Sequence, residues 1–168
     1  MLYLLDANIL INANNSYYPI GQVPEFWSWL RHQGETGQVK IPREIFEEIQ
    51  AGRKDGDSLL DWIADAGSEA ALLLDEDVDP NLVQRVVVDG YASDLTDVEV
   101  EKLGRDPFLI AYGLANVVDR CVVTAEVSAA KKQRQNKRIP DACRVLLVPC
   151  CGPFDLNRAL GFSTAWNR

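Results

Sequence analysis

The sequence has no apolar run that approaches the roughly 20 residues needed to span a bilayer. Its N-terminus carries no basic lead-in, and Asp6 interrupts the short apolar stretch that would form a signal-peptide core. We therefore expect a cytoplasmic protein that is not exported and has no membrane partner.

Cysteine and histidine are also scarce, with four cysteines and one histidine among 168 residues. The cysteines lack the paired spacing of a zinc ribbon or a thioredoxin-like motif. Cys121 and Cys143 adjoin apolar residues, which favours buried, reduced thiols, and His32 has no histidine companion. These absences argue against a zinc site.

The composition is that of an ordinary globular chain. Apolar residues make up 47% and charged residues 25%, and the length suits one domain over residues 1–168. The net charge is −8, which argues against a generic nucleic-acid coat protein, because phosphate contacts need a basic surface. It does not exclude a nuclease whose carboxylates bind divalent cations. The charge is uneven, with acids over residues 75–101 and a basic run at residues 131–138.

Apolar strands alternate with helical segments along the chain, and this alternation predicts a parallel α/β sheet. The first strand starts at Leu2 and ends at Asp6. Further strands are expected at residues 39–41, 71–74, 121–124 and 145–148. Helices are expected at residues 24–34, 42–51, 58–66, 81–91, 97–103, 106–116 and 154–160.

Acidic residues follow two of these strands directly. Asp6 ends the first strand, and Glu126 comes just after the strand at residues 121–124. The carboxyl ends of neighbouring parallel strands lie on one rim of a sheet, where ligands bind in open α/β folds. Glu48 and Asp106 could join the cluster from the helices above it. Each has a simpler interpretation as well: Asp6 can form a turn with Asn8, and Asp106 can cap the helix that it precedes.

Converging carboxylates repel one another, and a hard divalent cation relieves that repulsion. Mg²⁺ and Mn²⁺ prefer oxygen ligands and keep some of their waters. A bound ion of this kind can activate water and stabilise charge on a phosphodiester. The acids therefore indicate a hydrolytic nuclease site.

Four segments in order resemble the successive motifs of PIN domains, namely residues 5–10, 41–49, 106–111 and 123–126. The resemblance extends to about Val148. It implies a three-layer α/β/α sandwich with a central, mostly parallel sheet. Many PIN domains are metal-dependent ribonucleases, including the toxins of VapBC-type toxin–antitoxin pairs. The resemblance thus implies an RNA substrate, a cognate antitoxin and a homodimer.

Residue by residue, the resemblance assigns the acids to Asp6, Glu48, Asp106 and Glu126 and the strand-end hydroxyl to Thr124. All five would be catalytic, and the four acids would hold the metal. The family more often has aspartate at the last place, where this chain has Glu126. Asp141 is a second candidate for the same metal-binding role, or else a loop or helix-cap carboxylate. Glu44 and Glu47 share the helix of Glu48, and at least one of the three glutamates is expected to be a solvated surface charge.

The basic run at residues 131–138 has three interpretations. It could bind RNA phosphate near the acids, form a solvated helix face, or meet an acidic segment of a partner. The side chains available for RNA are Lys131, Lys132, Arg134, Lys137 and Arg138.

Tryptophan spacing yields one further expectation. Trp27 and Trp29 are two residues apart, so on one helix they should not both face inward. One of them is therefore expected at an interface with another subunit or an antitoxin. Trp62 has helical spacing with Leu59 and Ile63 and is expected in the core.

The sequence thus predicts a single PIN-like domain acting as a Mg²⁺- or Mn²⁺-dependent endoribonuclease, the toxin of a toxin–antitoxin pair. A non-catalytic PIN-like module that binds RNA or protein is the alternative. A phosphoryl-transfer enzyme with Asp6 as covalent nucleophile ranks lowest, because Asn8 stands where a second acid would be needed.

Overall fold

The computed structural model, which describes residues 1–52 and 56–168, is built on a parallel sheet. The strands are β1 (Leu2–Leu5), β2 (Val39–Lys40), β3 (Arg120–Val123) and β4 (Cys150–Cys151). Their order is β2-β1-β3-β4, and every pairing is parallel. The predicted α/β class with a parallel sheet is confirmed.

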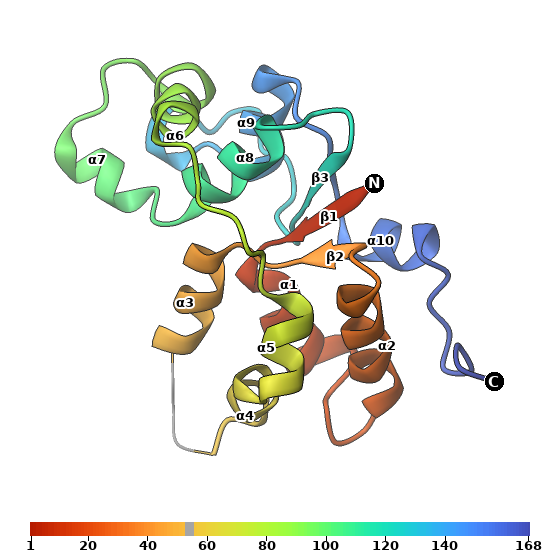
Figure 1. Ribbon diagram of the computed structural model, residues 1–168. Coiled ribbons are helices and arrows are strands. Elements are labelled where there is room, and N and C mark those ends of the chain that lie inside the picture. The colour runs from red at the N-terminus through yellow and green to blue at the C-terminus, as the bar shows by residue number, and fades with distance from the viewer. Residues whose placement is uncertain (53–55) are drawn as a thin grey trace.

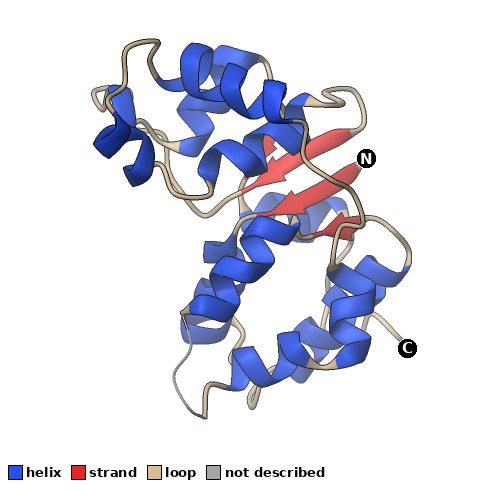
Figure 2. Cartoon of the chain, turned by 60° about the vertical axis from the view of Figure 1, so that its left-hand side comes forward, coloured by secondary structure: helices blue, strands red, loops and turns tan. Residues whose placement is uncertain are grey.

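Helices cover both faces of this sheet, and the arrangement is consistent with a three-layer sandwich (Figures 1 and 2). One layer holds α1 (Ala7–Asn12), α2 (Pro24–Glu35), α3 (Arg43–Ala51), α4 (Ser58–Ala64) and α5 (Ala66–Leu72). The other holds α6 (Pro80–Arg85), α7 (Asp97–Lys102), α8 (Asp106–Leu114) and α9 (Ile139–Leu146). The last helix is α10 (Pro153–Ala159). Two short π-helices are η1 (Ala13–Tyr17) and η2 (Val86–Tyr91), and a single 3-10 turn is η3 (Arg134–Asn136).

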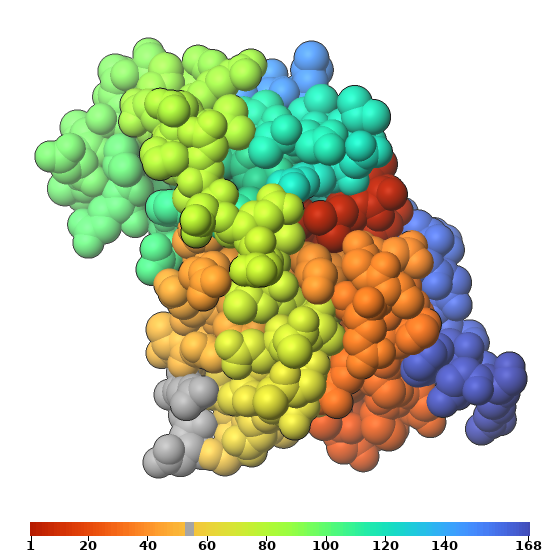
Figure 3. Space-filling view, in the orientation of Figure 1, coloured from red at the N-terminus to blue at the C-terminus, as the bar shows by residue number. Residues whose placement is uncertain are grey.

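The central strands are buried on both sides. Leu4, Leu5, Val122 and Val123 are fully buried, as expected for parallel strands between two helical layers. Gly113 lets α8 lie close to the sheet, because an added Cβ would meet Val122 and Val148 side-chain atoms at 2.9 and 2.8 Å. In the space-filling view, the segment of α6 and α7 projects on one side and the C-terminal segment lies on the other (Figure 3).

Two predicted strands are wrong. Residues 145–148 do not form a strand, because α9 continues to Leu146 and ends where Leu147 adopts a left-handed conformation (φ 58°). The apolar run there is the end of an amphipathic helix, and the strand follows at β4. Residues 71–74 are likewise helical up to Leu72, and Leu73 only bridges to Ile41.

The prediction that Trp27 and Trp29 cannot both face inward is also wrong, since they are 2% and 1% exposed. The Trp27 ring packs on Trp62 at 4.8 Å, and its indole N–H donates to the Tyr18 carbonyl oxygen at 2.7 Å. Trp29 packs against Phe162 of the C-terminal segment at 5.0 Å. Helix α2 is covered from two directions, so the sides that carry Trp27 and Trp29 are both buried, whereas Ser28 is exposed.

The expectations for the cysteines are confirmed, because Cys121 and Cys143 are buried free thiols. Among the described residues, no helix has the length and apolar character required to cross a membrane.

Candidate functional site

Asp6 and Thr124 meet where β1 and β3 end, and these two strands lie side by side in Figure 1. Leu5 pairs with Val123, so the next residue of each strand emerges at the same rim of the sheet. The Asp6 amide N–H donates to the Val123 carbonyl oxygen at 2.9 Å, and the Thr124 hydroxyl donates to Asp6 Oδ2 at 2.7 Å. Asp6 is 6% exposed and Thr124 2%. The predicted adjacency of these strand ends is therefore observed.

Asn8 connects the two loops that follow these strands. Its side-chain amide donates to Asp6 Oδ2 and, at 3.2 Å, to Thr124 Oγ1. The side-chain oxygen of Asn8, Oδ1, accepts a hydrogen bond from the Ala125 amide at 2.8 Å, and Thr124 Oγ1 accepts one from the Glu126 amide at 3.1 Å. Asn8 thus does more than form a turn, because it fixes the orientation of the Asp6 carboxylate.

Asp106 does not have the structural role that the sequence predicted for it. It is the first residue of α8, with Arg105 at the N-cap, so the predicted role of Asp106 as N-cap is wrong. Its carboxylate makes no hydrogen bond with any residue that the structure describes. Burial raises the pKa of Asp106 to about 8, and the charges of Asp6, Glu126 and Glu48 add to the increase, whereas Arg138 opposes it.

The same crowding affects Asp6. Burial raises the pKa of Asp6 to about 6, and the charges of Glu48 and Glu126 raise it further, whereas the Thr124 hydrogen bond lowers it. Glu48 and Glu126 are therefore close enough to raise the pKa of both aspartates. As free acids the four carboxylates cannot all be ionised near neutral pH without cost.

Glu48 and Glu126 form the outer part of this acidic cluster. Glu48 is exposed on α3, and the pKa of its carboxyl is raised by partial loss of water, with Arg105 opposing the shift. Glu126 accepts hydrogen bonds from Arg138 Nη1 at 2.6 Å and from the Ile139 amide at 2.8 Å. The second bond satisfies a free N–H at the start of α9, so Glu126 joins the cluster to that helix.

Asp141 lies outside the cluster. It is 7% exposed and accepts hydrogen bonds from the Ser128 hydroxyl, the Ala129 amide at 2.7 Å and Arg144 Nη1 at 2.8 Å. These hydrogen bonds hold the pKa of Asp141 below its usual range, and the bond from Ser128 has the largest effect. These contacts support a structural role for Asp141, in which its carboxylate holds the loop at Ser128 and Ala129.

Tyr91, at the end of η2, is a residue that the sequence analysis missed. Its ring is buried, and its hydroxyl makes no hydrogen bond with any residue that the structure describes. Burial raises the pKa of Tyr91, and the charges of Asp106, Glu126 and Asp6 raise it further, so the hydroxyl lies near the acids. Buried unpaired hydroxyls usually have a water or ion as partner. Nothing in the sequence around Tyr91 signals this position.

The basic run is a loop and a short turn, not the solvated helix face that was one expectation. Arg134 is paired with Asp94 and Glu99, and Lys137 Nζ donates to the carbonyl oxygens of Gly90 and Tyr91 at 2.6 and 3.2 Å. Arg138 pairs with Glu126. Lys131 and Lys132 are exposed.

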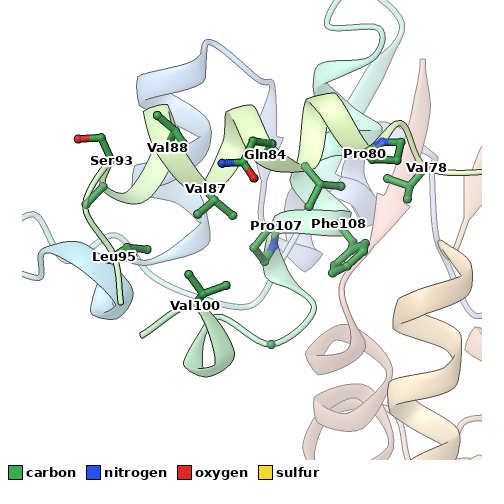
Figure 4. A pocket seen from close by; sticks show the side chains of 13 residues that line it. Val78, Pro80, Gln84, Val87, Val88, Ser93, Leu95, Val100, Pro107 and Phe108 are labelled. Carbon is green, nitrogen blue, oxygen red and sulfur yellow. The ribbon is translucent and has the colours of Figure 1, made fainter. Parts of the chain in front are cut away.

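A hollow of about 450 Å³ lies beside the first turn of α8 but contains no titratable side chain. Val87, Val100, Pro107 and Phe108 point into it from three helical segments (Figure 4). Arg105 interacts with both regions, because its guanidinium is 5.8 Å from the Phe108 ring and its charge opposes the rise in the pKa of Glu48. The hollow is therefore a neighbour of the acidic cluster, not a part of it.

The acidic cluster suits a hard cation better than a soft one. Within residues 1–52 and 56–168, no three acids, histidines or cysteines already converge on one point as metal ligands. Mg²⁺ needs only one or two carboxylates, because waters and substrate phosphates complete its shell. Asp6 and Asp106, both with raised pKa, provide oxygen donors of that kind. The unpaired Tyr91 hydroxyl adds a donor for a bound water.

Comparison with known proteins identifies one match. A family model described as a domain of unknown function (DUF4411) matches residues 3–164. No curated protein and no solved structure matches the chain.

Proposed function

The chain belongs to the DUF4411 family, and we propose that it is a PIN-like, Mg²⁺- or Mn²⁺-dependent endoribonuclease. The observation that carries this proposal is that Asp106 is partly buried beside Asp6, Glu48 and Glu126; burial first, and then the charges of these acids, raise the pKa of Asp106 to about 8. The cost of ionising these acids is removed when a doubly charged cation lies among them. Their position at the carboxyl ends of β1 and β3 is that of a ligand site in open α/β folds.

In this proposal Asp6 and Asp106 would hold the cation, with Glu48 and Glu126 at its edge, directly or through water. The ion would supply a nucleophilic water and stabilise charge on the phosphodiester. Thr124 and Asn8 keep one Asp6 oxygen hydrogen-bonded, which leaves the other free to bind. Arg138, which lies close enough to lower the pKa of Asp106, would offset negative charge that the substrate brings.

The biological role in this proposal is that of a toxin in the cytoplasm, neutralised by a cognate antitoxin and able to form a homodimer. The apolar hollow beside α8 supports a protein partner, because it could bury an apolar anchor side chain of the kind that dominates binding at protein interfaces. Between residues 75 and 105 the chain carries nine acids and three basic residues. A partner that covers the hollow would therefore be basic around its apolar anchor.

Metal-stimulated cleavage tests the proposal. Purified protein is expected to cleave single-stranded RNA with Mn²⁺ or Mg²⁺ and to lose this activity in EDTA. The products would be separated on a denaturing gel. Absence of cleavage with either ion, for protein shown to be folded, would overturn the proposed function.

One observation favours a second candidate, a non-catalytic module that binds RNA or protein. Both oxygens of Glu126 already accept hydrogen bonds from Arg138 and Ile139, so this acid is occupied within the protein. RNA binding without metal-dependent cleavage would favour that candidate.

Tyr91→Phe separates a structural from a functional role for the unpaired hydroxyl. We expect the free energy of unfolding to rise by about 1–3 kcal/mol, because a buried hydroxyl without a partner costs that much. We expect cleavage to slow by about tenfold, since the substituted ring cannot donate to a bound water or phosphate oxygen. Urea unfolding and initial cleavage rates measure the two effects.

Tyr112→Phe is the matched control. The Tyr112 ring is also buried, but its hydroxyl donates to the Glu76 carbonyl oxygen at 3.1 Å. That variant should lose about 1 kcal/mol of stability and keep the wild-type cleavage rate. Equal cleavage by wild type and Tyr91→Phe would show that the hydroxyl has no part in the reaction.

A further inference from the structure

A basic region stands out on this acidic protein. Between Val127 and Val148 the chain has six basic residues and one acid, whereas the whole chain has a net charge of −8. A cleft of about 230 Å³ lies in this region, between the loop of residues 130–137 and α9. Its charged lining is Lys132, Lys137, Arg144 and Asp141.

The negative charge in the cleft is already neutralised. Arg144 Nη1 donates to Asp141 at 2.8 Å, and Ser128 and Ala129 satisfy the remaining acceptors of that carboxylate. The Asp141 side chain is 8% exposed, whereas the Arg144 side chain is 65% exposed. The face of the cleft that meets solvent is therefore cationic.

The cleft is also held in shape by the rest of the basic region. Arg134 anchors the loop to Asp94 and Glu99, and Lys137 anchors it to the carbonyl oxygens of Gly90 and Tyr91. Lys132 is exposed, and its side chain makes no hydrogen bond or ion pair with the described residues. Lys132 and Arg144 thus remain available for an external anion.

The cleft adjoins the acidic cluster through α9. The first residue of that helix, Ile139, donates its amide to Glu126, and Arg144 is five residues further along. With a rise of 1.5 Å per residue, that separation is about 7.5 Å along the helix axis. If an RNA chain places its scissile phosphate at the acids, the next phosphate of its backbone would lie about this far away, near Arg144.

The geometry points to a phosphate-binding cleft, in which Lys132 and Arg144 hold the backbone of single-stranded RNA next to the acidic cluster while Lys137 keeps the loop in place. This inference deepens the proposed function and rests on it for the identity of the polyanion. Arg134 and Arg138 are paired with acids and are 39% and 40% exposed, whereas Arg144, which lies outside residues 131–138, is 65% exposed although it pairs with Asp141. The binding is electrostatic and independent of base sequence.

Binding of a fluorescein-labelled single-stranded RNA, measured by anisotropy in EDTA, tests the cleft without cleavage. Each phosphate contact on a single strand contributes about 0.7 to the slope of log K against log salt. Lys132→Ala and Arg144→Gln should therefore each lower that slope by about 0.7 and raise Kd about fivefold near about 0.1 M salt.

Arg158→Gln is the matched control, because Arg158 also forms an i,i+3 pair with an aspartate, Asp155, on an exposed helix. It should leave Kd and slope unchanged. Thermal unfolding of each variant checks that the fold is retained. If Arg144→Gln is unfolded, the result for Lys132→Ala decides the test.

The outcomes separate this inference from the proposed function. Unchanged Kd and slope in Lys132→Ala would overturn the proposal that the cleft binds phosphate, whatever the cleavage result. Cleft-dependent binding of polyglutamate in place of RNA would overturn it in favour of an acidic protein partner. Cleft-dependent RNA binding without metal-dependent cleavage would support the cleft and overturn only the ribonuclease.

Discussion

Asp106→Asn is expected to reduce RNA cleavage by about 10²- to 10⁴-fold, the effect of losing several kcal/mol of metal-dependent stabilisation of the transition state. The substitution keeps the size of the side chain and its place at the first residue of α8. It removes the charge that Asp6, Glu126 and Glu48 disfavour in the free protein. Initial rates on a labelled RNA pool with Mn²⁺ measure the effect.

The fold should survive this change. The Asp106 carboxylate makes no hydrogen bond with the described residues, so no such bond is lost, and relief of repulsion should raise Tm in EDTA at pH 8. Asp97→Asn is the matched control, since Asp97 is the first residue of α7 and is exposed. Asp97→Asn should cleave at the wild-type rate. Cleavage by Asp106→Asn within twofold (about 0.4 kcal/mol) of wild type would contradict the mechanism.

Stability should depend on pH and on divalent cations together. The pKa values of Asp6 and Asp106 are about 6 and about 8 in the folded protein, above the usual aspartate value. The folded state therefore binds more protons than the unfolded state between about pH 4 and pH 8. Stability without metal should fall as pH rises through this window, with a slope that approaches about 1.4 kcal/mol per pH unit for each proton.

A divalent cation should reverse this trend, because it binds the ionised carboxylates. At a concentration of about 100 Kd, ligand binding to the folded state adds about 2.7 kcal/mol. For a domain of this size that raises Tm by roughly 5–11 °C. The increase should be large at pH 8 and small at pH 5, where protons compete with the metal.

Thermal unfolding in Mn²⁺ and in EDTA, from pH 5 to pH 9, measures this effect. Asp106→Asn should flatten the pH dependence and lose most of the increase with Mn²⁺, whereas Asp97→Asn should retain both. A Tm that does not respond to Mn²⁺ at pH 8 would argue against a cation at the acidic cluster.

Much of the fold could be predicted because its strands are locally distinctive. β1 and β3 are short apolar runs closed by polar residues, and parallel pairing follows from the helices between them. That reasoning also predicted that Asp6 and Glu126 would lie on one rim if these strands were neighbours, and the structure pairs the two strands and hydrogen-bonds their following residues, Asp6 and Thr124. The functional roles of the acids stay predictions.

Other features depend on contacts that no local pattern contains. Residues 145–148 are apolar in either conformation, and the left-handed turn at Leu147 decides that the helix continues to Leu146. Trp29 is buried by Phe162, more than a hundred residues away. Tyr91 and Arg144 become candidates only through neighbours that the fold supplies.

The hydrogen bond from the Ile139 amide to Glu126 makes the start of α9 sensitive to what the acids do. If a cation draws the Glu126 carboxylate towards Asp106, that amide loses its acceptor and α9 begins to fray at its first turn. The amide proton of Ile139 should then exchange with deuterium faster in Mn²⁺ than in EDTA, even as the protein as a whole melts at a higher temperature. One backbone proton would thus report both on cation binding and on the stability of the first turn of α9.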